Sequence, residues 1–385
     1  MSWSRRRFSV ASSACLGALS VPAWAQSTAA PGVSPTHIRL GCTIPLSGLL
    51  GGAGAMHVEG IKAALANVNA DGGIHGRKIE LLVQDDGYVA DRATKNISEF
   101  IESQSVLALI SVMGTPSTLA ALKLTEPARV PLVGPITGAN SIRSANGHNT
   151  FFVRPSYQDE VQQLARQLGR FGMRDVGIAY LDNAFGKEAL ESMQAALANH
   201  KITSVGAVAL PADGKGGEQA AAAMAQLKPA GVLLASTGTA TTGFVLPFRK
   251  QMPSVPLAGL SVSVISSEMK HYGGASRGLA LTAVFPDIDS GKLSVSRMAR
   301  EAMARAKTGA INNTSFEGWL NAMLMIEGLK QAGRDLTRDS LRTALAGIRR
   351  LELGDYTLGF GEKAPYVGSK YMDLVVYGES FRRVG

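Results

Sequence analysis

Residues 38–48 read IRLGCTIPLSG and residues 69–86 read NADGGIHGRKIELLVQDD, and these stretches frame the first structural unit of the chain. The apolar run that opens the first stretch predicts a buried strand, and the apolar run at 78–83 predicts a second one. Between them, apolar residues recur at the spacing of one helix face: Ile61, Ala64, Leu65 and Val68. The glycine pair at 72–73 ends this helix. The order strand, helix, strand indicates a parallel β–α–β unit.

Short apolar runs alternate with amphipathic stretches along the rest of the chain, and the series restarts near Phe151. The pattern predicts helices at 91–103, 116–125, 159–171, 187–199, 217–226, 294–307, 316–332 and 339–347. It predicts strands at 106–112, 130–133, 176–181, 202–210, 231–235, 279–284 and 371–377, with a further strand and a short helix before about residue 272. Two successive α/β units follow, each offering a crevice at the carboxyl ends of its strands. Facing crevices predict a cleft that closes about a hinge.

The N-terminus has the layout of a secretory signal. Arg5, Arg6 and Arg7 precede an apolar run, and a small-x-small site at 23–25 precedes Gln26. We therefore expect a signal peptide at 1–25, cleaved near Ala25-Gln26, a flexible leader at 26–36, and a periplasmic location. The twin arginines within SRRRF at 4–8 favour twin-arginine export, and an ordinary Sec signal remains an alternative.

Composition narrows the function classes. Loss of the three arginines of the signal lowers the net charge from +9 to +6, and no basic cluster interleaves with aromatics, so we expect no nucleic-acid partner. Cys42 is then the remaining cysteine, and its apolar strand predicts a buried thiol rather than a disulfide or a nucleophile. The six histidines are far apart and show no metal spacing, and no nucleophile has an evident base, so we expect neither metal, cofactor nor catalysis. We also expect the protein to be a monomer. The aspartates at 85–86 are expected to hold the turn after their strand.

The order of these motifs resembles that of branched-chain-amino-acid-type, leucine-binding-protein-like, periplasmic solute-binding proteins of ABC importers. The resemblance rests on N-x-x-GG-I-x-G-x-x-I at 69–79 and the aspartate pair, and continues through GPITG at 134–138, YLDNAFG at 180–186 and residues 317–332. It implies an α/β fold with two Rossmann-like lobes, parallel-core sheets and three crossovers at the hinge, the type I periplasmic binding protein fold. It further implies that lobe 1 holds 37–153 plus 286–350, that lobe 2 holds 154–284 plus 352–385, and that ABC permease subunits are the partner.

Two loops of lobe 1 are the first candidates for binding the ligand. Thr115 and Pro116 stand where a strand ends and a helix begins, and free N–H groups at such a terminus favour a carboxylate. The resemblance implies that the hydroxyl at Thr115 binds the ligand carboxylate; the alternative is a plain helix cap. The resemblance also implies a contact from the loop that contains Ile136, Thr137 and Gly138, where glycine stands in place of the family's threonine.

Lobe 2 and the first loop depart from the amino-acid binders of this family. Phe185 is expected to cover the ligand, with Tyr157 as a second aromatic candidate. The resemblance implies larger or acidic groups where Ala53, Thr237 and Ser261 stand. Because a buried ammonium without a carboxylate partner is costly, we expect a carboxylate-bearing ligand, aromatic or otherwise bulky, that need not be leucine, isoleucine or valine.

Glu317 could replace the missing acid, but the sequence Thr314-Ser315-Phe316-Glu317 favours a capping box instead. The leading interpretation is an amino-acid or organic-acid receptor for import. A ligand sensor for a signalling partner and an exported hydrolase remain as alternatives.

Overall fold

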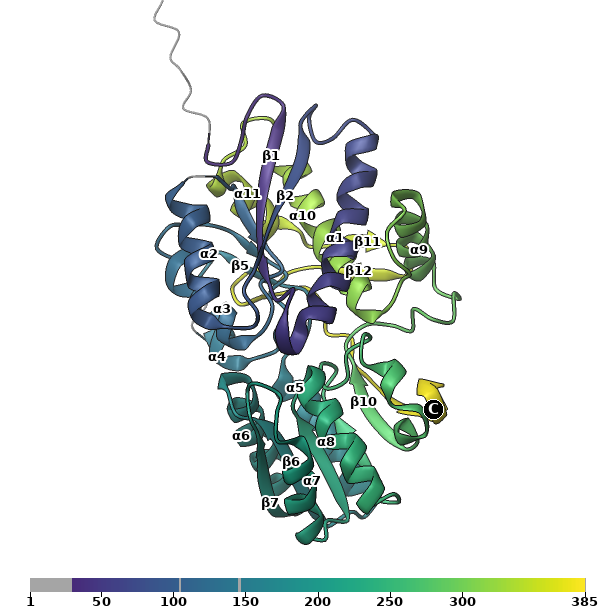
Figure 1. Ribbon diagram of the computed structural model, residues 1–385. Coiled ribbons are helices and arrows are strands. Elements are labelled where there is room, and N and C mark those ends of the chain that lie inside the picture. The colour runs from purple at the N-terminus through teal and green to yellow at the C-terminus, as the bar shows by residue number, and fades with distance from the viewer. Residues whose placement is uncertain (1–29, 104, 145–146, 385) are drawn as a thin grey trace, which may run out of the picture.

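The computed structural model describes residues 30–103, 105–144 and 147–384, which form two α/β lobes, one above the other in Figure 1. The predicted signal peptide and its cleavage site lie outside the described residues. Residues 30–36, expected to be a flexible leader, instead fold back on the first strand, where Val33 bridges Ile38 and the Arg39 N–H donates to the Gly32 carbonyl. No helix in the described part of the chain is long and apolar enough to cross a membrane.

Each lobe is built on a six-stranded sheet. The first sheet has the order β13-β5-β4-β3-β1-β2 and is parallel throughout. Its strands are β1 (His37–Ile44), β2 (Lys78–Asp85), β3 (Ala108–Ile110), β4 (Leu132–Val133), β5 (Thr150–Phe152) and β13 (Tyr366–Val367). The second sheet has the order β14-β10-β9-β8-β6-β7, with β14 alone antiparallel to its neighbour. Its strands are β6 (Asp175–Leu181), β7 (Thr203–Leu210), β8 (Gly231–Ala235), β9 (Leu257–Gly259), β10 (Leu279–Ala283) and β14 (Asp373–Tyr377).

Helices cover both faces of each sheet, which explains the near-continuous apolar runs of the central strands. The first lobe carries α1 (Gly51–Ala70), α2 (Ala90–Glu102), α3 (Thr115–Thr125), α4 (Asn140–Ser144), α9 (Ser294–Ala306), α10 (Asn313–Ala332) and α11 (Arg338–Gly347). The second carries α5 (Tyr157–Arg170), α6 (Ala184–Asn199), α7 (Gly217–Gln226) and α8 (Gly238–Gln251). A side chain at Gly60 would overlap the Ser315 carbonyl, so this glycine lets α1 and α10 pack in close contact.

The chain passes between the two sheets three times: after β5, after β10 and after β13. The predicted α/β class with two lobes is confirmed. The last crossing comes later than expected, because residues 366–367 pair with β5 in the first sheet. The assignment of all residues from 352 onward to lobe 2 is therefore wrong for this segment, and a two-residue strand gave no periodic signal to reveal it.

Two other elements differ from the prediction. A fourteen-residue helix, α8, precedes β9, where the sequence suggested only a strand and a short helix. Its interior holds Pro247 and the β-branched pair Thr241 and Thr242, which weaken a helical pattern read from sequence. The small antiparallel pair β11 (Leu351–Leu353) and β12 (Tyr356–Leu358) was also not predicted.

Candidate functional site

A pocket lies between the lobes and encloses about 960 Å³, including space open to solvent. Its walls are loops that follow strands of both sheets, which is where ligands of open α/β sheets bind. Seven of the ten residues predicted to contact the ligand line this pocket: Ala53, Thr115, Ile136, Tyr157, Phe185, Thr237 and Ser261. Their convergence from separate segments places the candidate site at the expected cleft.

Thr115 is the first residue of α3, directly after the buried strand β3. The cap position is Gly114, so no side chain in the described chain caps this helix terminus. Thr115 is buried, and its Oγ1 lies 2.8 Å from Oγ1 of Thr137. The alternative interpretation of Thr115 as a plain N-cap is wrong, because its own backbone is already helical and Gly114 holds the cap position.

The remaining predicted residues of lobe 1 support the pocket wall from behind. Thr137 does not line the pocket; its hydroxyl accepts a hydrogen bond from the Ala139 N–H and fixes the Thr115 hydroxyl. Gly138 packs directly against the Tyr157 ring, and Pro116 lies within the first turn of α3. Contact of these residues with a ligand stays a prediction.

Two aromatic side chains from lobe 2 close one side of the pocket. The rings of Tyr157 and Phe185 have centroids 5.2 Å apart and are tilted by 59°. Phe185 is held because the Asn183 side chain caps α6. Tyr88, which the sequence did not single out, also lines the pocket, and its hydroxyl accepts a hydrogen bond from Asn183.

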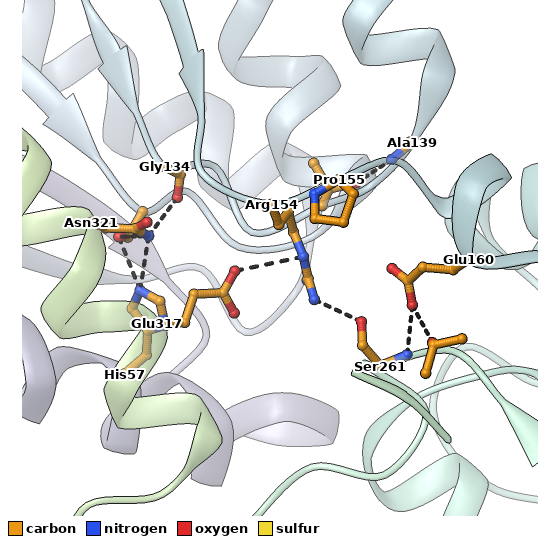
Figure 2. A network of polar contacts seen from close by, with 12 residues as sticks. His57, Gly134, Ala139, Arg154, Pro155, Glu160, Ser261, Glu317 and Asn321 are labelled. Carbon is orange, nitrogen blue, oxygen red and sulfur yellow. Dashed lines mark hydrogen bonds and ion pairs between the residues drawn. The ribbon is translucent and has the colours of Figure 1, made fainter. Parts of the chain in front are cut away.

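A buried arginine stands at the crossing between the lobes, and sequence reasoning missed it. Arg154 is 2 % exposed; its Nη2 donates to the Ser261 hydroxyl at 2.8 Å, and its Nε lies 3.6 Å from Oε1 of Glu317 (Figure 2). Ser261 in turn donates its backbone N–H to Glu160 at 2.8 Å, and Thr282 donates to the same carboxylate oxygen. The polar centre of the pocket is therefore a chain of charged and hydroxyl groups that spans both lobes.

Glu317 does not cap α10, contrary to the prediction. The cap is Asn312, whose side chain accepts from the Thr314 and Ser315 N–H groups, while the Ser315 hydroxyl accepts from the Asn312 N–H. The cap thus lies two residues before Thr314, and Glu317 is free to face the pocket, where it is 7 % exposed. Asparagine is as good an N-cap as serine or threonine, so residue type alone does not decide between a cap at Asn312 and a cap at Thr314.

His57 lines the pocket from α1 and belongs to a buried network. Its Nε2 lies 3.0 Å from the Ser111 hydroxyl, and Asn321 donates to Ser111 at 2.9 Å and to the Gly134 carbonyl at 2.8 Å (Figure 2). This network joins α1, α10 and the loops after β3 and β4, and so fixes the floor of the site.

Burial governs the charges of these groups. Burial, reinforced by the Arg154 charge, lowers the pKa of His57 to about 3, so this imidazole is neutral near pH 7. Burial raises the pKa of Glu317, although Arg154 acts in the opposite direction. Burial works to lower the pKa of Arg154, but Glu317, Tyr157 and Glu160 outweigh it and the pKa is raised, so the guanidinium stays charged.

The described residues contain no group of side chains that could hold a metal ion. No cluster of three or more His, Cys, Asp or Glu side chains occurs there. The expected buried thiol is confirmed, since Cys42 is 0 % exposed and burial raises its pKa. The expected role of the aspartate pair is confirmed as well: Asp85 accepts from the Leu46 and Gly87 N–H groups, and Asp86 accepts from the Tyr88 N–H.

Comparisons with known proteins agree with this architecture. The periplasmic binding protein family matches residues 37–364. The Leu/Ile/Val-binding protein homolog 7 of Brucella abortus is 30% identical over 179 residues, which are 44% of this chain and 44% of that protein, so the matched region spans less than half of the relative.

Two solved structures share nearly the whole fold. An extracellular ligand-binding receptor from Verminephrobacter eiseniae is 28% identical, with a TM-score of 0.83 over 91% of this chain and 100% of that one. A solute-binding protein of an ABC transporter from R. palustris, in complex with benzoate, is 18% identical, with a TM-score of 0.79 over 91% and 98% of the two chains.

Proposed function

We propose a solute-capturing function for this chain, which belongs to the periplasmic binding protein family. The membership confirms the resemblance drawn from residues 69–79 and 85–86. In this proposal the chain is exported to the periplasm, binds an amino acid or related carboxylate-bearing small molecule between its lobes, and delivers it to the permease of an ABC importer.

The observation that carries the proposal is the helix terminus at Thr115. It opens into a pocket lined by both lobes, has no side-chain cap in the described chain, and presents a buried hydroxyl whose orientation Thr137 fixes. Unpaired backbone N–H groups and the helix dipole together favour an anion at this point. A carboxylate placed there would contact lobe 1 while the rest of the molecule touches lobe 2.

The pocket walls favour a cargo with an apolar body. The apolar residues of the lining include Val262, Val264, Ile265, Leu281 and Phe285. Benzoate in the R. palustris relative supports the idea that this fold accepts an aromatic carboxylate. The name of the Brucella relative points to branched-chain amino acids, and Glu317, for which the sequence favoured a capping role, lies in the pocket as an acid.

The test is calorimetry on protein that has been unfolded, dialysed and refolded, against a panel of amino acids and aromatic and aliphatic carboxylates. We expect at least one carboxylate to bind, and small-angle scattering to show that it compacts the protein, because closure requires tighter binding to the closed state. Binding of neutral molecules alone, or binding without compaction, would contradict the proposal.

A further inference from the structure

Arg154 has more hydrogen-bond donors than the protein uses. Its Nη2 reaches Ser261, but Nε and Nη1 are buried and have no hydrogen-bond partner among the described residues. An arginine carries five N–H donors, and a buried donor without a partner is costly. Because Arg154 lines the interlobe pocket, the missing partner is best supplied by a molecule within it.

Glu317 offers an acceptor beside these donors. Its Oε1 lies 3.6 Å from Nε of Arg154, which is an ion-pair distance but too long for a hydrogen bond. The Glu317 side chain keeps 9% of its surface exposed and also lines the pocket. A donor and an acceptor therefore stand side by side without satisfying each other.

The charges of this pair select a neutral group. Arg154 would repel an ammonium placed between them, and Glu317 would repel a second carboxylate. Glu160, the other buried carboxylate nearby, already accepts from Ser261 and Thr282 through one oxygen. A hydroxyl or a carboxamide both accepts and donates, so it can accept from Arg154 and donate to Glu317 at once.

We propose that Arg154 and Glu317 form a second polar subsite that binds a hydroxyl or carboxamide of the cargo, so that the cargo is a carboxylate bearing such a neutral group on an apolar skeleton. The inference rests on the proposed function, because Thr115 and the terminus of α3 are taken to hold the carboxylate. A site with buried polar groups discriminates strongly against an analogue that lacks their partner.

The experiment uses matched series that differ in one group: benzoate with its 3- and 4-hydroxy, carbamoyl and carboxy derivatives, and hexanoate with 6-hydroxyhexanoate, 6-amino-6-oxohexanoate and adipate. Affinities are measured by calorimetry for the wild type and for Glu317→Gln, with Glu327→Gln as a control that makes the same substitution on α10 outside the pocket lining. Thermal unfolding establishes that each variant is folded.

In the wild type we expect at least one hydroxyl or carboxamide derivative to bind tenfold or more tightly than its parent, and the dicarboxylate to gain nothing. In Glu317→Gln, where Arg154 is no longer opposed, we expect the dicarboxylate to gain tenfold or more relative to the hydroxyl derivative. A gain of this kind cannot result from misfolding. We expect Glu327→Gln to keep the wild-type order of affinities.

Different failures have different meanings. If parent carboxylates bind but neither the hydroxyl nor the carboxamide improves binding, or if the preference is unchanged in Glu317→Gln, the subsite is refuted and the proposed function stands. If no carboxylate of any series or of the amino-acid panel binds, the assignment of Thr115 fails and the subsite falls with it.

Discussion

Replacement of Asp86 by asparagine should change how the stability of this protein depends on pH. Asp86 is 0 % exposed, follows β2 and accepts hydrogen bonds from the Tyr88 N–H and the Thr43 hydroxyl. Burial raises its pKa from 3.8 to about 6, with a smaller contribution from the neighbouring Asp85, although these hydrogen bonds act against the rise. Asparagine keeps the shape and one of the two acceptor oxygens but cannot ionise, so any cost of the lost acceptor is the same at every pH.

The sign follows from the direction of the shift. The pKa is higher in the folded state than in the unfolded chain, so the unfolded chain loses this proton first as the pH rises. The stability that the protein has below pH 3.8 is therefore lost progressively between pH 3.8 and about pH 6. One pKa unit corresponds to about 1.4 kcal/mol, so the full loss is about 3 kcal/mol. Part of this loss occurs below pH 4, so the free energy of unfolding that is lost between pH 4 and pH 7.5 is about 2 kcal/mol. Asp86→Asn has no ionisable group at this position and should not show this loss of stability.

The assay is urea unfolding followed by circular dichroism at pH 4 and pH 7.5. We expect the free energy of unfolding of Asp86→Asn, relative to the wild type, to be about 2 kcal/mol more favourable at pH 7.5 than at pH 4. Asp85→Asn is the matched control. Burial works to raise the pKa of Asp85, but hydrogen bonds from Ser47, Leu46, Gly87 and Arg92 outweigh it and lower the pKa, so its stabilisation is lost only at more acid pH. Equal differences between Asp86→Asn and the wild type at both pH values would refute the reasoning.

Three further predictions concern the site and the core. Thr115→Ala should weaken the binding of a carboxylate probe, measured by calorimetry, by about tenfold to a hundredfold, as expected for loss of a hydrogen bond to a charged group. Thr115→Ser keeps the hydroxyl and should bind the probe nearly as tightly as the wild type does. An equal loss of affinity in both variants would contradict a hydroxyl contact. Gly134→Ala should lower the free energy of unfolding by about 2 kcal/mol or more, because Gly134 has a φ of +60° and its new methyl group would overlap Asn321; an unchanged thermal midpoint would contradict this. The Cys42 thiol should resist a thiol reagent such as DTNB until the protein unfolds, and rapid labelling of the native protein would show that its strand is not buried as described.

Local patterns predicted most elements because each depends on neighbours in sequence. The strand at Gly231–Ala235 and the helix at Gly217–Gln226 have the predicted bounds, since apolar runs and helical spacing mark them directly. The strand at Tyr366–Val367 was missed because two residues have no period, and its pairing with β5 is set by the tertiary fold. The convergence of Thr115 and Phe185 on one pocket followed from family resemblance and could not be derived from spacing.

Arg154 shows why the polar centre was hidden in the sequence and why it matters. The residue lies on the first crossing, Glu317 lies on α10 after the second, and Ser261 lies in a loop of lobe 2, so the three are far apart in the chain. One guanidinium therefore contacts both lobes and the pocket. A ligand that takes up its free donors must bind best in the lobe arrangement that brings Glu317 and Ser261 to it, because a ligand shifts a conformational equilibrium only through differential affinity. In the proposed subsite, the group that selects the cargo is thus also placed to couple binding of the cargo to closure of the lobes.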